Sequence, residues 1–96
     1  MTRYALRPRA RRDIEEIWDC SVAAWGVRQA ENYVRQVQRS LEILANYPRL
    51  GRACDDIRPG YRKHPTGSHV VFYRIDEDGI EVVRILHQRM DFEPRL

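Results

Sequence analysis

Apolar positions recur at helical spacing in the first quarter of the chain. Pro8 fits the first turn of a helix, where its missing N–H is harmless, and Gly26 fits a C-terminal cap. Between them, the positions expected to face a core follow one another at three- and four-residue intervals: Ala10, Ile14, Ile17, Trp18, Ser21 and Trp25. The pattern predicts an amphipathic helix that begins at Pro8 and ends before Gly26.

A second run predicts a second helix with a sharper apolar stripe. Its stripe keeps a 4-3-4-3 spacing through Ala30, Val34, Val37, Leu41 and Leu44, and Pro48 and Gly51 follow its end. The stripe is too short for a coiled coil, so it indicates packing on a core. The connection between the two helices is also short, which predicts an antiparallel hairpin.

The period changes to two after Ile57. Three segments, "IRPGYRKH", "SHVVFYRI" and "GIEVVRILH", are separated by the turn sequences "PTG" and "DEDG". Together with a brief alternation in "RYALR" near the N-terminus, they predict the order β-α-α-β-β-β. We therefore expect an α+β fold in which the helical hairpin packs on one face of a small, mainly antiparallel sheet.

Strict alternation assigns the strand residues to two faces of that sheet. It places Val71, Tyr73, Ile75, Val83 and Ile85 on one face of the sheet. The opposite face carries Val70, Phe72, Arg74, Val82, Arg84 and Leu86. Two helices cover only one face, and the other still carries apolar residues among arginines. Such a face indicates a protein partner, and the alternative is a C-terminal tail that folds back over it.

Composition limits the class of protein. The chain has 96 residues, of which 43% are hydrophobic and 32% charged, and these values are typical of a single globular domain spanning residues 1–96. Its net charge of +3 is too weak and too interleaved to indicate a nucleic-acid surface. No apolar run reaches the roughly 18 to 20 residues of a membrane span, and the N-terminus lacks the apolar segment of a secretory signal. We expect a cytoplasmic protein.

Neither cofactor nor metal is expected. Cys20 and Cys54 are too few for a disulfide framework, and His64 and His69 lie five residues apart across a predicted turn without a further ligand nearby. "RLGR" and "RPG" lack the pattern of a phosphate-binding loop.

Five segments cover the chain in order and nearly end to end: "YALRPRARRDIEEIW", "WGVRQAENY", "LANYPRLGR", "IRPGYRKHPTGSHVVFYRI" and "GIEVVRILHQRMD". As an ordered set they resemble the ParE branch of the RelE/ParE superfamily of bacterial toxins. The resemblance implies the toxin of a type II toxin–antitoxin system, neutralised by a ParD-like or similar antitoxin in a hetero-oligomer. In that reading the antitoxin would bind the open face of the sheet, at Arg62, Val70, Phe72, Arg74, Val82, Arg84 and Leu86.

The superfamily holds two kinds of toxin, and the resemblance favours one of them. ParE-like members are associated with poisoning of DNA gyrase, whereas RelE-like members cleave messenger RNA on the ribosome. In an ungapped comparison Val70 stands where the ribonuclease branch has a catalytic arginine, and valine cannot stabilise a developing negative charge. Binding to gyrase is therefore the expected function, with any contact to nucleic acid made through gyrase or the antitoxin.

Two alternatives stay open. A basic cluster of Arg62, Lys63, His64 and His87 would serve RNA cleavage if the fold brought the four together. A relative that has lost toxicity would retain only antitoxin binding. A lone histidine at a strand end is more often structural, and we expect the ring of His87 to bond to the backbone or to Asp91.

Two surfaces are candidates for the gyrase contact. One is the exposed side of the second helix, with Arg28, Arg35 and Arg39. The other is the C-terminal segment, with Arg89, Asp91 and Phe92.

Overall fold

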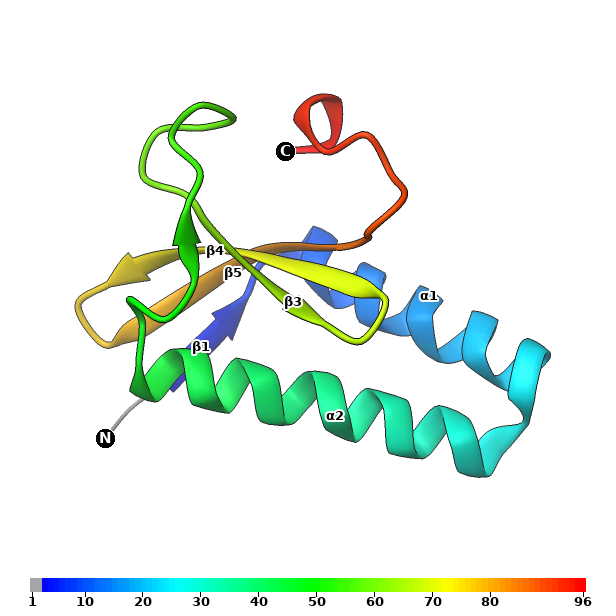
Figure 1. Cartoon of the computed structure of the whole chain (residues 1–96). Coiled ribbons are helices and arrows are strands. Elements are labelled where there is room, and N and C mark those ends of the chain that lie inside the picture. Colours follow the sequence, from blue (N-terminus) through cyan, green and yellow to red (C-terminus); the bar gives the residue numbers. More distant parts are fainter. Residues whose placement is uncertain (1–2) are drawn as a thin grey trace.

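The computed structural model describes residues 3–96, and their helices form a hairpin that lies against one face of a five-stranded sheet (Figure 1). Helix α1 spans Pro8–Trp25 and helix α2 spans Val27–Asn46. Gly26, with φ of 89°, is the single residue between them, and this left-handed conformation favours glycine. The predicted hairpin and its ends are confirmed.

The sheet has the order β1-β5-β4-β3-β2. Its strands are β1 (Arg3–Leu6), β2 (Arg52–Ala53), β3 (Arg62–Thr66), β4 (His69–Asp76) and β5 (Gly79–His87). Strand β1 runs parallel to β5 and the remaining pairs are antiparallel. A short 3-10 helix, Glu93–Arg95, lies near the C-terminus. The predicted α+β class is confirmed, and the two-residue β2 adds an edge strand that the sequence pattern did not indicate.

The predicted strand "IRPGYRKH" was placed too early. Residues 57–61 form turns, and β3 begins at Arg62 and continues through Pro65 to Thr66. Proline is tolerated there because β2 pairs only with Arg62 and Lys63, so the missing N–H at Pro65 interrupts no ladder on that side.

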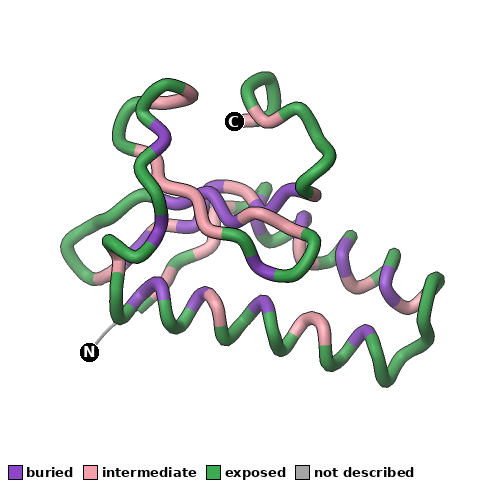
Figure 2. Tube along the Cα trace, in the orientation of Figure 1, coloured by how far each residue is buried: buried purple, intermediate pink, exposed green. Residues whose placement is uncertain are grey.

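The main core lies between the helices and the sheet. It contains the stripe residues Val37, Leu41 and Leu44 with Val71, Tyr73, Ile80, Val82 and Ile85 from the strands. Trp25, expected on the core side of α1, is instead 64% exposed at the hairpin end. Figure 2 shows the buried positions concentrated in the sheet and along the inner sides of the helices.

A second, smaller core lies on the opposite face of the sheet. There Cys54, Phe72 and Leu86 are buried beneath Ile57, Tyr61, Val70, Phe92 and Leu96. Val70 belongs to β4 itself, and the other covering residues come from the loop 54–61 and the C-terminal tail 88–96, which rise on the side of the sheet away from the helices (Figure 1). The tail therefore folds back over the sheet, which was the alternative to an open partner-binding face.

Candidate functional site

The proposed antitoxin face is largely covered by the protein itself. Phe72 is 0% exposed and Leu86 is 1% exposed. The ring of Phe92 packs edge-on against Phe72, with 4.9 Å between ring centroids. These two apolar strand residues are thus part of a closed core, and the prediction of an open apolar face is wrong for them.

Val82 lies on the other face from the one predicted. The pairing runs Phe72 with Arg84 and Tyr73 with Val82, so Val83 is an extra residue without its own partner on β4. This β-bulge shifts the alternation by one position and turns Val82 into the helix-side core, where it is 0% exposed. Val82 therefore cannot belong to the outer face.

Arg84 is held in an ion pair that the sequence did not reveal. Its Nε donates to Asp13 Oδ2 at 2.8 Å, and its Nη2 donates to Asp13 Oδ1 at 2.9 Å. The Asp13 carboxylate also accepts the backbone N–H of Ile85 at 2.9 Å, and it holds the pKa of Arg84 above its ordinary value. Because Arg84 Nη1 donates to the carbonyl oxygen of Arg95 at 2.8 Å, this arginine joins α1, β5 and the tail rather than lying open to a partner.

The remaining predicted antitoxin contacts stay closer to solvent. Arg74 is exposed and its guanidinium lies 5.8 Å from the centroid of the Tyr61 ring, which is a cation–π geometry. Arg62 is half-buried and its Nη1 donates to the Gly51 carbonyl oxygen at 2.6 Å. Val70 is half-buried at the margin of the outer core.

The fold does not assemble the four candidate ribonuclease residues. Arg62 pairs with Tyr73 and His64 with Val71, so both lie on the helix side of β3, and Lys63 alternates to the other face. Strand spacing places the Cα atoms of His64 and His87 roughly 12 Å apart, two strands across and two residues along. Because Lys63 lies on the opposite face of the sheet from Arg62 and His64, the four side chains do not all face one reacting group.

His87 makes a structural hydrogen bond, as predicted. Its Nδ1 accepts the backbone N–H of Arg89 at 3.1 Å, where the chain leaves β5. Its ring meets that of His69 edge-on, with 5.3 Å between centroids. The prediction that His87 bonds to the backbone is confirmed.

His69 is linked to α2 through Tyr33. Its Nδ1 lies 2.6 Å from the Tyr33 hydroxyl, and that hydroxyl accepts the Ser68 N–H at 2.9 Å. The hydroxyl also lies 3.4 Å from the Thr66 carbonyl oxygen, to which it can donate, and the tautomer of His69 sets which partner donates in the Tyr33–His69 bond. Burial, and to a lesser extent the neighbouring His87, lower the pKa of His69 below its usual value. These contacts favour a neutral ring that fastens the β3–β4 turn to the helix.

The two candidate gyrase surfaces lie apart. Arg28, Arg35 and Arg39 are exposed and share one side of α2, because they are spaced by seven and four residues. Arg89 and Asp91 are exposed on the tail, whereas Phe92 is half-buried on the outer core. Figure 1 shows α2 and the tail on opposite sides of the sheet.

A cleft of about 760 Å³ lies between α1 and the region where β5 leads into the tail. Its lining includes Cys20, Trp25, His69 and His87. Cys20 is exposed there, whereas Cys54 is buried in the outer core, and burial raises the pKa of the Cys54 thiol. Within residues 3–96, no group of three or more histidine, cysteine or acidic side chains is placed to hold a metal ion.

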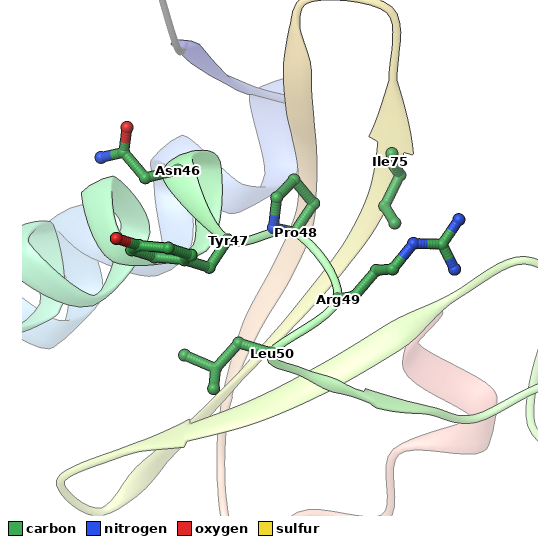
Figure 3. A pocket seen from close by; sticks show the side chains of 6 residues that line it. All are labelled: Asn46, Tyr47, Pro48, Arg49, Leu50 and Ile75. Carbon is green, nitrogen blue, oxygen red and sulfur yellow. The ribbon is translucent and has the colours of Figure 1, made fainter.

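A hollow at the C-terminal end of α2 was missed by the sequence analysis. It measures about 690 Å³ and is lined by Asn46, Tyr47, Pro48, Arg49, Leu50 and Ile75 (Figure 3). The sequence analysis included Tyr47 and Leu50 only within the family-matching piece "LANYPRLGR". The useful signal was the pair of large apolar residues in "NYPRLG", a segment where exposed turns normally carry small or polar side chains.

Comparison with known proteins identifies the class of protein to which this fold and surface belong. Residues 4–92 match the sequence profile of the family described as the ParE toxin of type II toxin–antitoxin system, parDE. The chain therefore belongs to the ParE family of type II toxins, and membership in a toxin–antitoxin system implies an antitoxin partner.

Individual relatives cover almost the whole chain. It is 55% identical to Toxin ParE1 of Mycobacterium tuberculosis over 96 residues, with 99% of this chain and 98% of the relative covered. It is 42% identical to Toxin ParE1 of Caulobacter vibrioides over 96 residues, covering 100% and 99% of the two chains. A solved structure described as the chromosomal ParDE TA system from P. aeruginosa has the same fold, with a TM-score of 0.78, 20% identity, and coverage of 91% of this chain and 96% of that one. The resemblance drawn from the sequence segments is thus confirmed.

Proposed function

We propose that this toxin acts by binding DNA gyrase and trapping its complex with cleaved DNA. Family membership supports a toxin, and the failure of Arg62, Lys63, His64 and His87 to converge is the observation that favours binding over RNA cleavage. A gyrase poison needs a complementary surface and no catalytic group of its own. Action on gyrase places the toxin in the cytoplasm.

The test is a gyrase–DNA cleavage assay with purified, antitoxin-free protein, ATP and detergent trapping. We expect linear DNA to accumulate, and the accumulation to disappear when the antitoxin encoded beside the toxin gene is added. Cleavage of ribosome-bound messenger RNA without trapped gyrase would favour the ribonuclease alternative instead. Loss of both activities in correctly folded protein would indicate a relative that only binds antitoxin.

Charge-reversal variants separate the two candidate gyrase surfaces. Arg35→Glu combined with Arg39→Glu alters the exposed stripe of α2, and Arg89→Glu alters the tail. Arg11→Glu combined with Arg12→Glu is the matched control for the α2 variant, and Arg11→Glu alone is the control for Arg89→Glu, because each makes the same charge change on exposed positions of α1. We expect one of the first two variants to lose at least ten-fold in trapping and its control to stay within two-fold. Equal losses in the variants and their controls would argue for a general charge effect and against either surface.

We also propose that Arg74 contacts an antitoxin carboxylate, because it is exposed and its guanidinium lies over the Tyr61 ring. Arg74→Glu should weaken antitoxin binding without unfolding the protein. Arg84→Glu is unsuitable for this test, because it would break the buried pair with Asp13.

A further inference from the structure

Large apolar side chains gather at the C-terminal end of α2. We define the α2-end patch as Ile43, Tyr47, Leu50 and Ile75, which are 47%, 68%, 54% and 43% exposed. Ile43 lies one helical turn before Tyr47, and the other three line the hollow in Figure 3. An exposed apolar group of this kind marks an interaction site more often than a scattered surface residue does.

The loop that carries the patch is fixed from beneath. The buried Tyr73 hydroxyl donates to the Pro48 carbonyl oxygen at 2.6 Å and accepts the Gly51 N–H at 2.9 Å. A further bond joins the Leu50 N–H to the Tyr47 carbonyl oxygen at 2.9 Å, and Arg62 holds the Gly51 carbonyl oxygen. Because the backbone is tied on both sides of Leu50, its side chain is held outward. A preorganised apolar surface loses little conformational entropy when a partner binds.

The charges around the hollow argue against a second copy of this chain as the occupant. Arg49 is the charged residue among the six that line it, and Figure 3 shows its side chain extending toward the side of the hollow where Ile75 lies. In a two-fold contact the same patch meets itself, so each Arg49 would approach the other copy's Arg49 with no lining carboxylate to compensate. The hollow suits a partner that combines apolar side chains with a negative charge.

We propose that the α2-end patch docks a segment of the antitoxin that carries neighbouring large apolar side chains and an adjacent carboxylate. The apolar side chains fill the hollow between Tyr47, Leu50 and Ile75, and the carboxylate pairs with Arg49. This inference rests on the assignment of the chain as a toxin with an antitoxin partner. It adds a contact surface distinct from the outer face at Arg74.

The direct test measures affinity for the purified antitoxin encoded beside the toxin gene. Leu50→Asp places a like charge opposite the antitoxin carboxylate, and we expect it to raise the Kd at least ten-fold. Val27→Asp is the matched control, since Val27 is 53% exposed against 54% for Leu50 and lies at the opposite end of α2. We expect the control to change the Kd less than two-fold. Equal Kd values for the wild type and both variants would overturn the proposal.

Two further readouts identify other occupants. Sedimentation of the free toxin would reveal a self-associated form that Leu50→Asp abolishes if a second copy occupied the patch. The gyrase cleavage assay would show reduced trapping by Leu50→Asp, at unchanged antitoxin affinity, if gyrase occupied it. Either result would overturn the antitoxin as occupant.

The design keeps this inference separate from gyrase poisoning. A weakened antitoxin complex with Leu50→Asp supports the docking surface even if wild-type toxin fails to trap gyrase. Conversely, if Leu50→Asp traps gyrase normally and keeps its affinity for the antitoxin, only the proposal of the docking surface is overturned. If wild-type toxin does not bind the antitoxin at all, the partner and its docking surface fail together.

Discussion

Asp13 accepts three N–H donors, two from Arg84 and one from the backbone of Ile85. Its side chain is 7% exposed and that of Arg84 is 13% exposed, so the pair is screened little by solvent. A single carboxylate thereby links α1 with β5 and, through Arg84, with the tail. Sequence analysis read Arg84 as free to meet a partner, because nothing local shows that a residue 71 positions earlier lies beside it.

Asp13→Asn should destabilise the fold strongly. The amide keeps the shape but loses the charge and one acceptor, and it leaves Arg84 charged and poorly paired with its side chain mostly out of solvent. We expect the free energy of unfolding to fall by about 3 kcal/mol, measured by urea denaturation. Glu81→Gln is the control, because the Arg7–Glu81 pair is 37% exposed on both sides and should contribute less than about 1 kcal/mol. Similar decreases in the free energy of unfolding for Asp13→Asn and Glu81→Gln would contradict the larger role assigned to the Asp13–Arg84 pair.

His69 should make stability depend on pH. Its folded pKa is lowered by burial, so below the unfolded value, about 6.5, the unfolded chain binds more protons than the folded one. The contribution of neutral His69 to the free energy of unfolding is therefore fully present above its unfolded pKa, and it is lost as the pH falls toward its folded pKa. We expect urea midpoints to decline as the pH is lowered from 7 to 5, and His69→Gln to decline less steeply.

Measurements at pH 8 separate this effect from packing. There the unfolded histidine is already neutral, so any difference between His69→Gln and the wild type reports lost contacts with Tyr33 rather than protonation. The same slope in both proteins between pH 7 and 5 would show that His69 is not responsible.

Elements differ in how well the sequence predicted them. Both helices, β4 and β5 were predicted closely, because each helix carries a full run of period 3.6 and each of these strands is an apolar run bounded by turn sequences. The two residues of β2 are too few to show a period, and their pairing with Arg62 and Lys63 is set by tertiary contacts. Val82 was assigned to the wrong face because the unpaired Val83 interrupts the alternation without leaving a turn residue as a signal.

The contact between β1 and the start of β5 depends on a glycine. Gly79 has φ of 149°, and a Cβ there would collide with the carbonyl oxygen of Arg3. We expect Gly79→Ala to separate the parallel pair and lower the free energy of unfolding by about 3 kcal/mol, since the clash adds to backbone strain. Gly60→Ala is the matched control: its φ of 82° is also strained, but nothing lies within 4 Å of the added Cβ.

Gly60→Ala should therefore cost only about 1 kcal/mol, the strain of the left-handed conformation alone. Thermal unfolding followed by circular dichroism would measure both variants. If the Gly79→Ala protein were as stable as the Gly60→Ala protein, β1 would be able to shift away from β5 without a loss of stability.

At the scale of the whole molecule, two cores of unequal size lie on either side of one sheet. The helix-side core unites both helices with three strands, whereas the outer core depends on the loop 54–61 and the tail. Residue patterns predicted the first because its stripes are periodic. The patterns did not predict which residues cover the outer core, because "RMDFEPRL" has no period that shows where Phe92 and Leu96 pack.

The outer core should be the weaker of the two. Leu41→Ala removes a side chain that is 0% exposed in the main core, and we expect it to cost about 3 kcal/mol. Phe92→Ala removes a half-buried ring and should cost about 2 kcal/mol while loosening the tail. Hydrogen exchange would confirm this if backbone amides in the tail exchange faster in Phe92→Ala and those in α2 do not. Faster exchange throughout both regions would mean that the two cores unfold as one unit.

The unequal placement of the two cysteines has a practical consequence. A maleimide reagent requires an accessible thiolate, which Cys20 can supply from the wall of its cleft, whereas Cys54 is 1% exposed and its thiol is harder to ionise. The natural sequence thus offers one attachment point for a fluorophore, in the same cleft as the indole of Trp25. A dye on Cys20 that is quenched by Trp25 would report movements of the hairpin end during complex formation, without an engineered cysteine.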